Sequence, residues 1–110
     1  MKKVMVTIDT SDRNISRVTL EIDAASENIA VKTPMGSGTA VLTAIGKILA
    51  KHKLTVADIT EVHVETGPGS YTGLRVGVAI ANMLGELLSV PVNGLPVGQS
   101  VTPVYEGDRW

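Results

Sequence analysis

Four short segments of this chain alternate apolar and polar residues, and this alternation restricts the possible folds more than any other feature. The segments are residues 4–9, 17–23, 28–32 and 61–65. A period of two is typical of β-strands, whose successive side chains point to opposite faces of a sheet. One set of alternate positions is Val, Ile and Leu, and the other is mostly polar. A sheet covered on both faces has continuously apolar strands, so we expect two layers, with helices on the apolar face only.

The sequence around these strands predicts two helices and a fifth strand. Residues 40–52 place apolar side chains at helical spacing, residues 74–88 are apolar nearly all round, and Pro91 to Leu95 reads as a strand. The order βββαβαβ implies an α/β fold with a mixed five-stranded sheet, in which an antiparallel meander joins parallel strands through right-handed crossovers. We expect one domain over residues 1–95 and an irregular tail over residues 96–110, which begins with poor helix formers.

Composition excludes several function classes. The 110 residues carry a formal net charge of −1, which gives no general attraction to nucleic acid or anionic membranes. The chain has no cysteine, so it has no disulfide, thiolate nucleophile or thiolate metal site. The apolar run after Lys2 and Lys3 ends too early, at Thr7 and Asp9, for a signal peptide. We therefore expect a cytoplasmic chain that does not bind membranes and contacts RNA only locally or through a partner.

From Gly69 onward, and through the second predicted helix, small residues recur at every fourth position, at Gly69, Gly73, Gly77, Ala81 and Gly85. This spacing aligns them in one row, where another backbone can approach closely. Each interior glycine costs about 1 kcal/mol relative to alanine, which favours a contact function for the row.

The second predicted helix is apolar nearly all round, and no third helix is predicted to cover it. We therefore favour a protein partner over the two helices, either a second copy or a different subunit. Tight packing within the chain is the alternative. The predicted interface comprises Ile45, Leu49, Tyr71, Gly73, Leu74, Gly77, Val78, Ile80, Ala81, Leu84, Gly85 and Leu88.

A glycine-rich turn opens the second helix at Thr66 to Gly73, and such a turn can bind phosphate through backbone N–H groups. No lysine follows the turn as in a P-loop, and the dinucleotide-binding spacing is absent. We therefore favour a structural turn, with Ser70 or Thr72 as the helix cap. The possible phosphate loop, taken with the end of the first strand, comprises Asp9, Thr10, Ser11, Gly67, Gly69, Ser70, Thr72 and Arg75.

Two other polar groups have a functional and a structural interpretation. Asp9 to Ser11 end the first strand, where carboxylates hold metal or phosphate in several α/β folds, but local backbone bonding is the favoured interpretation. Glu61, His63 and Glu65 share one strand face, and an exposed polar face is favoured there over a metal or acid–base site. We predict no metal, no cofactor and no catalytic residue.

Residues 6–11 and 67–77 together resemble the bacterial TsaB family, also called YeaZ. The resemblance implies an actin-like, ribonuclease H-like half with sheet order 3-2-1-4-5. It also implies a role in threonylcarbamoylation of adenosine 37 of tRNAs that read codons beginning with A. In that family the protein is a non-catalytic subunit that supports the catalytic subunit TsaD through the helices of its N-terminal lobe. The ATPase TsaE completes the assembly, and contact with tRNA is indirect.

Family members usually continue for a second lobe, whereas this sequence ends at Trp110. Because polar residues stand on the sheet face that a further helix would cover, we expect a self-sufficient minimal version. Two other functions stay open. One is a nucleotide-binding or phosphate-binding half-site completed by dimerisation, and the other is a structural homodimer outside the modification pathway.

Overall fold

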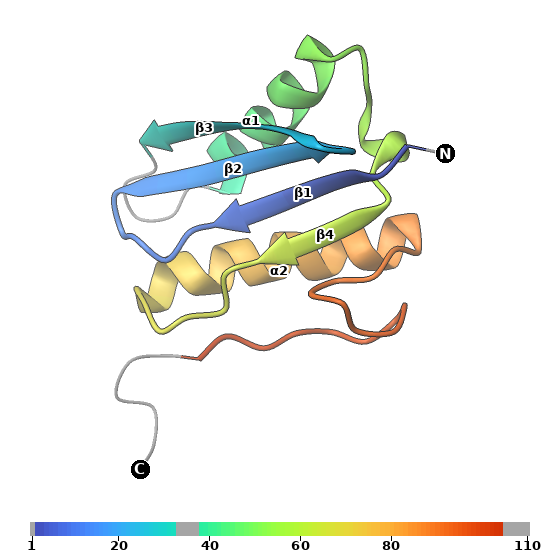
Figure 1. Ribbon diagram of the computed structural model, residues 1–110. Coiled ribbons are helices and arrows are strands. Elements are labelled where there is room, and N and C mark those ends of the chain that lie inside the picture. The colour runs from blue at the N-terminus through green and yellow to red at the C-terminus, as the bar shows by residue number, and fades with distance from the viewer. Residues whose placement is uncertain (1, 33–37, 105–110) are drawn as a thin grey trace.

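The structure, a computed structural model, describes residues 2–32 and 38–104. Three strands come first, then a helix, a short 3-10 turn, a fourth strand and a long helix (Figure 1). The elements are β1 (Val4–Asp9), β2 (Ile15–Ile22), β3 (Ala25–Lys32), α1 (Gly38–Lys51), η1 (Val56–Asp58), β4 (Glu61–Val64) and α2 (Tyr71–Leu88).

The strands form one mixed sheet in the order β3-β2-β1-β4. β1 pairs antiparallel with β2, from Val4 opposite Ile22 to Asp9 opposite Arg17, and β2 pairs antiparallel with β3. β4 lies parallel to β1 on its other side. The predicted meander and the crossover to a parallel strand are therefore present, and each strand lies within three residues of its expected bounds.

Both helices lie on the same side of the sheet (Figure 1), with α1 against β2 and β3 and α2 against β1 and β4. The alternate apolar residues of β1, β2 and β4 are buried beneath them, whereas their polar neighbours are half-buried or exposed. The fully buried large side chains come from both layers: Val4, Val6, Ile8, Val18, Leu20, Val41, Ile45, Leu49, Val62 and Leu74. A sheet with one apolar face thus forms two layers, as the alternation predicts.

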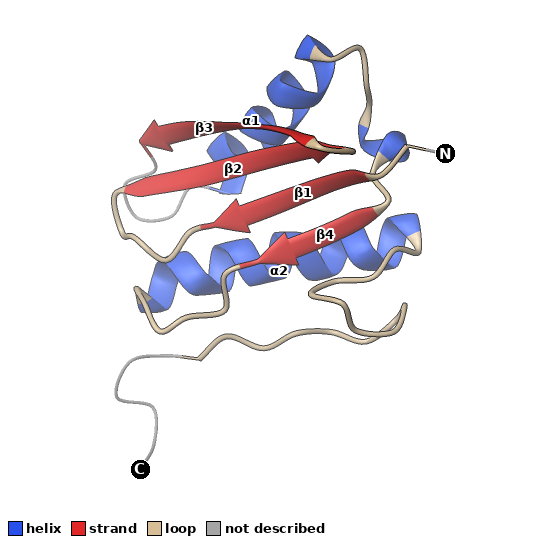
Figure 2. Cartoon of the chain, viewed as in Figure 1, coloured by secondary structure: helices blue, strands red, loops and turns tan. Residues whose placement is uncertain are grey.

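The prediction of a fifth strand over Pro91 to Leu95 is wrong. Val92 forms a single parallel bridge with Val62, and Figure 2 draws the chain after α2 as loop. Asn93 and Gly94 take positive φ values of 52° and 74°, which turn the backbone out of the extended conformation. The sheet therefore has four strands in the described part of the chain.

Asn93 continues the pairing with its side chain. Its Oδ1 accepts from the backbone N–H of Val64 at 2.8 Å, and its Nδ2 donates to the Val64 carbonyl at 3.1 Å. The carboxamide thus replaces the next backbone pair of a ladder. This contact holds the start of the C-terminal segment against the edge of β4.

Residues 96–104 then pass alongside α2 (Figures 1 and 2). Asn82 of α2 holds the backbone of Val101 at both polar groups, with two hydrogen bonds of 2.9 Å. The Val101 side chain is buried, and the Val104 N–H donates to the Thr66 carbonyl at 2.6 Å. The chain's own segment therefore covers part of the helix for which the sequence suggested a partner.

Among the described residues, no helix combines the length and apolarity needed to cross a membrane.

Candidate functional site

The end of β1 and the glycine-rich turn, the two predicted motifs, come together in the fold. The Thr10 hydroxyl is buried and donates to the Gly73 carbonyl at 2.6 Å. The Ser70 N–H donates to the Ser11 carbonyl at 2.8 Å. Residues more than 55 positions apart in the sequence are thus joined by direct hydrogen bonds at the start of α2.

The glycine row faces this junction. A Cβ on Gly73 would lie 2.1 Å from the Thr10 carbonyl oxygen, and one on Gly77 would lie 2.2 Å from Thr10 Oγ1. The equivalent positions at Gly69 and Gly85 would meet Ser11 and Val92. The close contact predicted for the row therefore exists, but it is made within the chain, which is the alternative interpretation of the spacing.

Three backbone N–H groups of the turn, those of Gly67, Ser70 and Gly73, are bonded inside the protein. Gly67 donates to Glu65 Oε1 at 3.1 Å, and Gly73 donates to Ser70 Oγ at 3.4 Å. Ser70, one of the two residues predicted to cap the helix, is the N-cap of α2. Thr72 and Arg75 are exposed. These contacts favour a structural turn over a phosphate cradle.

Asp9 lies between two hollows on the uncovered sheet face. One hollow, of about 120 Å³, is lined by Asp9, Ser11, Asp12, Ile15 and Arg17. The other, of about 370 Å³, lies at the carboxyl ends of β1 and β4 and is lined by Thr7, Asp9, His63, Val64, Glu65 and Asn93.

The larger hollow is lined by two carboxylates and by no Lys or Arg. A phosphate group placed there would face like charge, which is unfavourable. Asp9 Oδ1 also accepts hydrogen bonds from the Ser11 N–H and hydroxyl, at 3.0 and 2.6 Å. The hypothesis of a phosphate half-site around Asp9 receives no support from this lining.

The predicted Glu61, His63 and Glu65 group does not converge on one point. His63 Nε2 lies 2.6 Å from Glu61 Oε2, whereas Glu65 bonds to the turn. No group of three or more His, Asp or Glu side chains able to hold a metal ion occurs in the described ranges 2–32 and 38–104. His63 and Glu61 therefore contact each other, and Glu65 contacts the backbone of the turn.

The second histidine belongs to an ion cluster between α1 and β3. His52 Nε2 lies 2.9 Å from Glu27 Oε1, and Lys51 Nζ contacts the other oxygen of the same carboxylate. The hydrogen bond from Lys51, and then that from His52, lowers the pKa of Glu27 below its ordinary value.

The predicted interface residues lie mainly in the core of this chain. Buried are Ile45, Leu49, Gly73, Leu74, Gly77, Val78, Ile80, Ala81, Leu84 and Gly85, while Leu88 is partly buried against the core. The side chain of Tyr71 lies outside the described part. Partner contact through these residues stays a prediction, and in the single chain they pack inward.

Other helix residues supply the exposed apolar surface. Leu42 of α1 is 43% exposed, and Met83 and Leu87 of α2 are 40% and 72% exposed. The sequence prediction missed them because apolarity all round a helix does not show which side faces solvent. The spacing of Met83 and Leu87 does place both on one face of α2.

Comparison with protein families gives one match over more than half of the chain. The family described as TsaD: tRNA N6-adenosine threonylcarbamoyltransferase matches residues 38–100, which include both helices and β4.

Curated relatives carry the name tRNA threonylcarbamoyladenosine biosynthesis protein TsaB. That of Bacillus subtilis is 26% identical and covers 96% of this chain, which spans 51% of the relative. That of Buchnera aphidicola is 31% identical, with 86% of this chain and 45% of the relative covered. The chain therefore spans about half the length of these relatives.

A solved structure, YeaZ from Pseudomonas aeruginosa, shares the fold. It aligns with a TM-score of 0.76 at 19% identity and covers 86% of this chain and 44% of its own. A second structure, titled as an uncharacterized protein with similarity to peptidase YeaZ from Pseudomonas aeruginosa, aligns with a TM-score of 0.77.

Proposed function

The chain belongs to the family described as TsaD: tRNA N6-adenosine threonylcarbamoyltransferase, and two of its curated relatives are named TsaB. From these two findings we propose that it is a TsaB-like accessory subunit. In this proposal it assembles with a TsaD-like catalytic subunit for threonylcarbamoylation of adenosine 37 of tRNA. A TsaE-like ATPase joins the wider complex, contact with tRNA is indirect, and the complex works in the cytoplasm.

The observation that carries the proposal is the match of the relatives over nearly the whole chain. A non-catalytic role is supported by the site at the end of β1, where Thr10 and Ser11 form hydrogen bonds to the start of α2 and Asp9 Oδ1 accepts from Ser11. Thr10 and Ser11 thus position the helix, and Asp9 orients Ser11.

Assembly in this proposal uses the surface of α1 and α2 away from the sheet. Leu42, Met83 and Leu87 are exposed there, while residues of the predicted interface such as Ile45, Ala81 and Leu84 lie buried in the core. The buried residues would hold the two helices in place, and the exposed ones would contact the partner. The partner is a second copy of the chain or a TsaD-like subunit.

Measuring the mass in solution tests the assembly. The chain is analysed by size-exclusion chromatography with light scattering, alone and mixed with a bacterial TsaD protein. We expect a homodimer alone, a complex with TsaD, or both. Monomers at micromolar concentration in both samples would contradict the proposal.

A modification assay tests the pathway role. The chain is expressed in a bacterium depleted of its own TsaB, and threonylcarbamoyladenosine in tRNA is measured by mass spectrometry. Recovery of the modified nucleoside is expected. Assembly without recovery would favour a structural homodimer or an inactive complex over the accessory role.

A further inference from the structure

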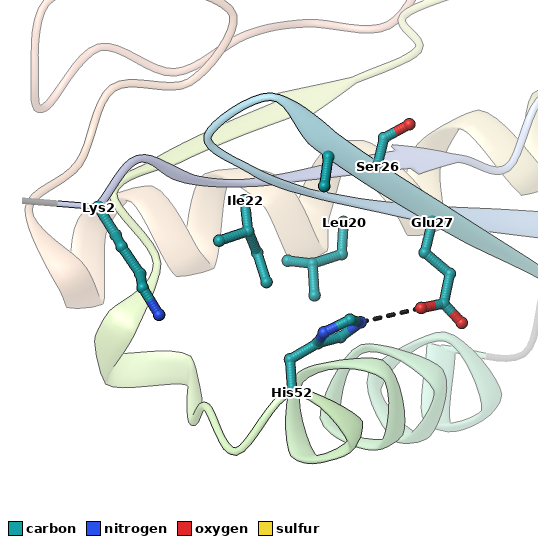
Figure 3. A pocket seen from close by; sticks show the side chains of 7 residues that line it. Lys2, Leu20, Ile22, Ser26, Glu27 and His52 are labelled. Atoms are coloured by element: carbon teal, nitrogen blue, oxygen red, sulfur yellow. Dashed lines mark hydrogen bonds and ion pairs between the residues drawn. The ribbon is translucent and has the colours of Figure 1, made fainter.

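A hollow lies at the end of the molecule opposite Asp9, where β1 begins (Figure 3). Its volume is about 320 Å³, near the lower end of small-molecule pockets in proteins. The lining residues are Lys2, Leu20, Ile22, Ala25, Ser26, Glu27 and His52. They come from the segment before β1, from the β2–β3 hairpin and from the end of α1.

The hairpin supplies an apolar wall. Leu20 is 1% exposed and belongs to the core, and Ile22 packs partly buried against that core. Ala25, the first residue of β3, adds a methyl group to the same lining. Apolar surface of a ligand placed here would leave water, at a gain that scales with the area covered.

The two charged side chains that line the hollow differ in their contacts: Glu27 has partners within the protein, and Lys2 has none among the described residues. Glu27 is shared between His52, at 2.9 Å from its Oε1, and Lys51, which contacts its Oε2. The Glu27 charge is thus compensated by Lys51 from the adjacent helix. Lys2 lines the hollow as well, and among the described residues no hydrogen bond or ion pair engages its ammonium group.

Figure 3 shows how these groups are directed. The Lys2 side chain extends toward the space between Ile22 and His52, while the hydroxyl of Ser26 points away from it. The His52 ring forms the wall opposite the hairpin, with one nitrogen turned to Glu27. An apolar wall, an aromatic ring and an uncompensated ammonium therefore face one space.

We propose that this hollow binds a small carboxylate with a compact hydrocarbon body, held by Lys2 at the charged end and by Leu20, Ile22 and the His52 ring at the apolar end. A cationic ligand would meet the Lys2 charge, and a large ligand would exceed the volume. The site is independent of the accessory role, because none of its residues belongs to the β1 junction or to the exposed helix face.

Benzoate and benzamide are suitable probes, since they share a shape and differ in charge. Each is titrated into the ¹⁵N-labelled chain and followed by NMR. We expect benzoate to shift the amides of Leu20, Ile22 and Glu27 with a Kd on the order of 1 mM. Benzamide should bind about fivefold more weakly or worse. Equal affinity for the two probes, or benzoate shifts spread over all exposed cationic segments, would overturn the proposal.

Two variants and matched controls locate the site. Lys2→Met should weaken benzoate binding about fivefold, whereas Lys53→Met, next to His52 but outside the lining, should not change it. Ala25→Leu should fill the hollow and remove binding, whereas Ala30→Leu at an exposed position further along β3 should not. Unchanged binding in a folded Ala25→Leu variant would place the probe elsewhere and refute the site.

Discussion

At the scale of single residues, the glycines of the two helices have opposite surroundings. A Cβ at Gly46 of α1 would meet nothing within 4 Å, whereas one at Gly73 would meet the Thr10 carbonyl oxygen at 2.1 Å. Gly46→Ala should therefore raise the free energy of unfolding by about 1 kcal/mol, through helix propensity alone. Gly73→Ala should lower it by about 2 to 3 kcal/mol, because a backbone oxygen has little room to move. Urea denaturation of both variants measures these changes.

Gly77 offers a sharper version of the same test. Its added Cβ would meet the Thr10 side chain, at 2.2 Å from Oγ1, rather than the Thr10 backbone. The Thr10→Ala substitution should therefore offset part of the loss caused by Gly77→Ala, but none of the loss caused by Gly73→Ala. A double-mutant cycle for each pair measures this difference. Equal coupling in both cycles would show that the helix shifts as a whole.

Glu27 makes the stability of the fold dependent on pH in the acid range. Lys51, and then His52, lower the pKa of its carboxyl in the folded chain. A depressed folded pKa contributes stability above the unfolded value, near 4.3, and that contribution is lost as the pH falls through the folded pKa. Glu27→Gln should therefore be less stable than the parent at pH 6, with the difference shrinking as the pH falls through the folded pKa. Denaturant unfolding across this range tests it, and Glu86→Gln, at an exposed position of α2, serves as the control.

At the scale of elements, Asn93 replaces a strand pair with one side chain. Asn93→Gly keeps the positive φ of 52° but removes both bonds to Val64, so stability should fall by about 1 to 2 kcal/mol. Hydrogen exchange at the Val64 amide should accelerate with it. Ser89→Gly is the matched control, because Ser89 also has a positive φ, of 54°, as the C-cap of α2. That control should gain up to about 1 kcal/mol.

The elements also show how far the sequence predicts this fold. Alternation in β1, β2 and β4 predicts which face is buried, because strand period and burial follow from the same geometry. The fifth strand fails because Asn93 and Gly94, inside the predicted range of Pro91 to Leu95, turn the backbone out of the extended conformation. A polar residue followed by glycine is a turn signal, and giving it more weight would have ended the strand at Val92.

The candidate site, too, could be predicted from the sequence only in part. Spacing alone indicates that the glycines form one close-contact row, but it does not identify what lies opposite. Thr10 and Ser11 lie more than 55 positions before the glycines that they contact. Only the tertiary fold, which places β4 beside β1 and then leads into α2, brings them together. Residues such as Leu87 are exposed for the converse reason, since no described part of the chain covers that face of α2.

At the scale of the whole molecule, a substitution on the exposed helix face can test assembly without disturbing the fold. Gly77→Leu cannot test an interface, because its side chain would enter the contact with Thr10 and disturb the fold itself. Leu87 is 72% exposed, so Leu87→Glu should change the free energy of unfolding by less than about 0.5 kcal/mol. It should nevertheless weaken association of the chain with its partner by about 30-fold, as for a central interface residue.

Val97→Glu is the matched control for that substitution. Val97 is also an exposed apolar residue, at 55%, but it lies in the C-terminal segment rather than on a helix. Light scattering with and without a TsaD protein would compare the two variants at equal concentration. Loss of association in Leu87→Glu alone assigns the interface to the helix face. Equal loss of association in both variants would mean that the partner binds exposed apolar surface in general. Unchanged association in both would show that the interface does not include this face of α2.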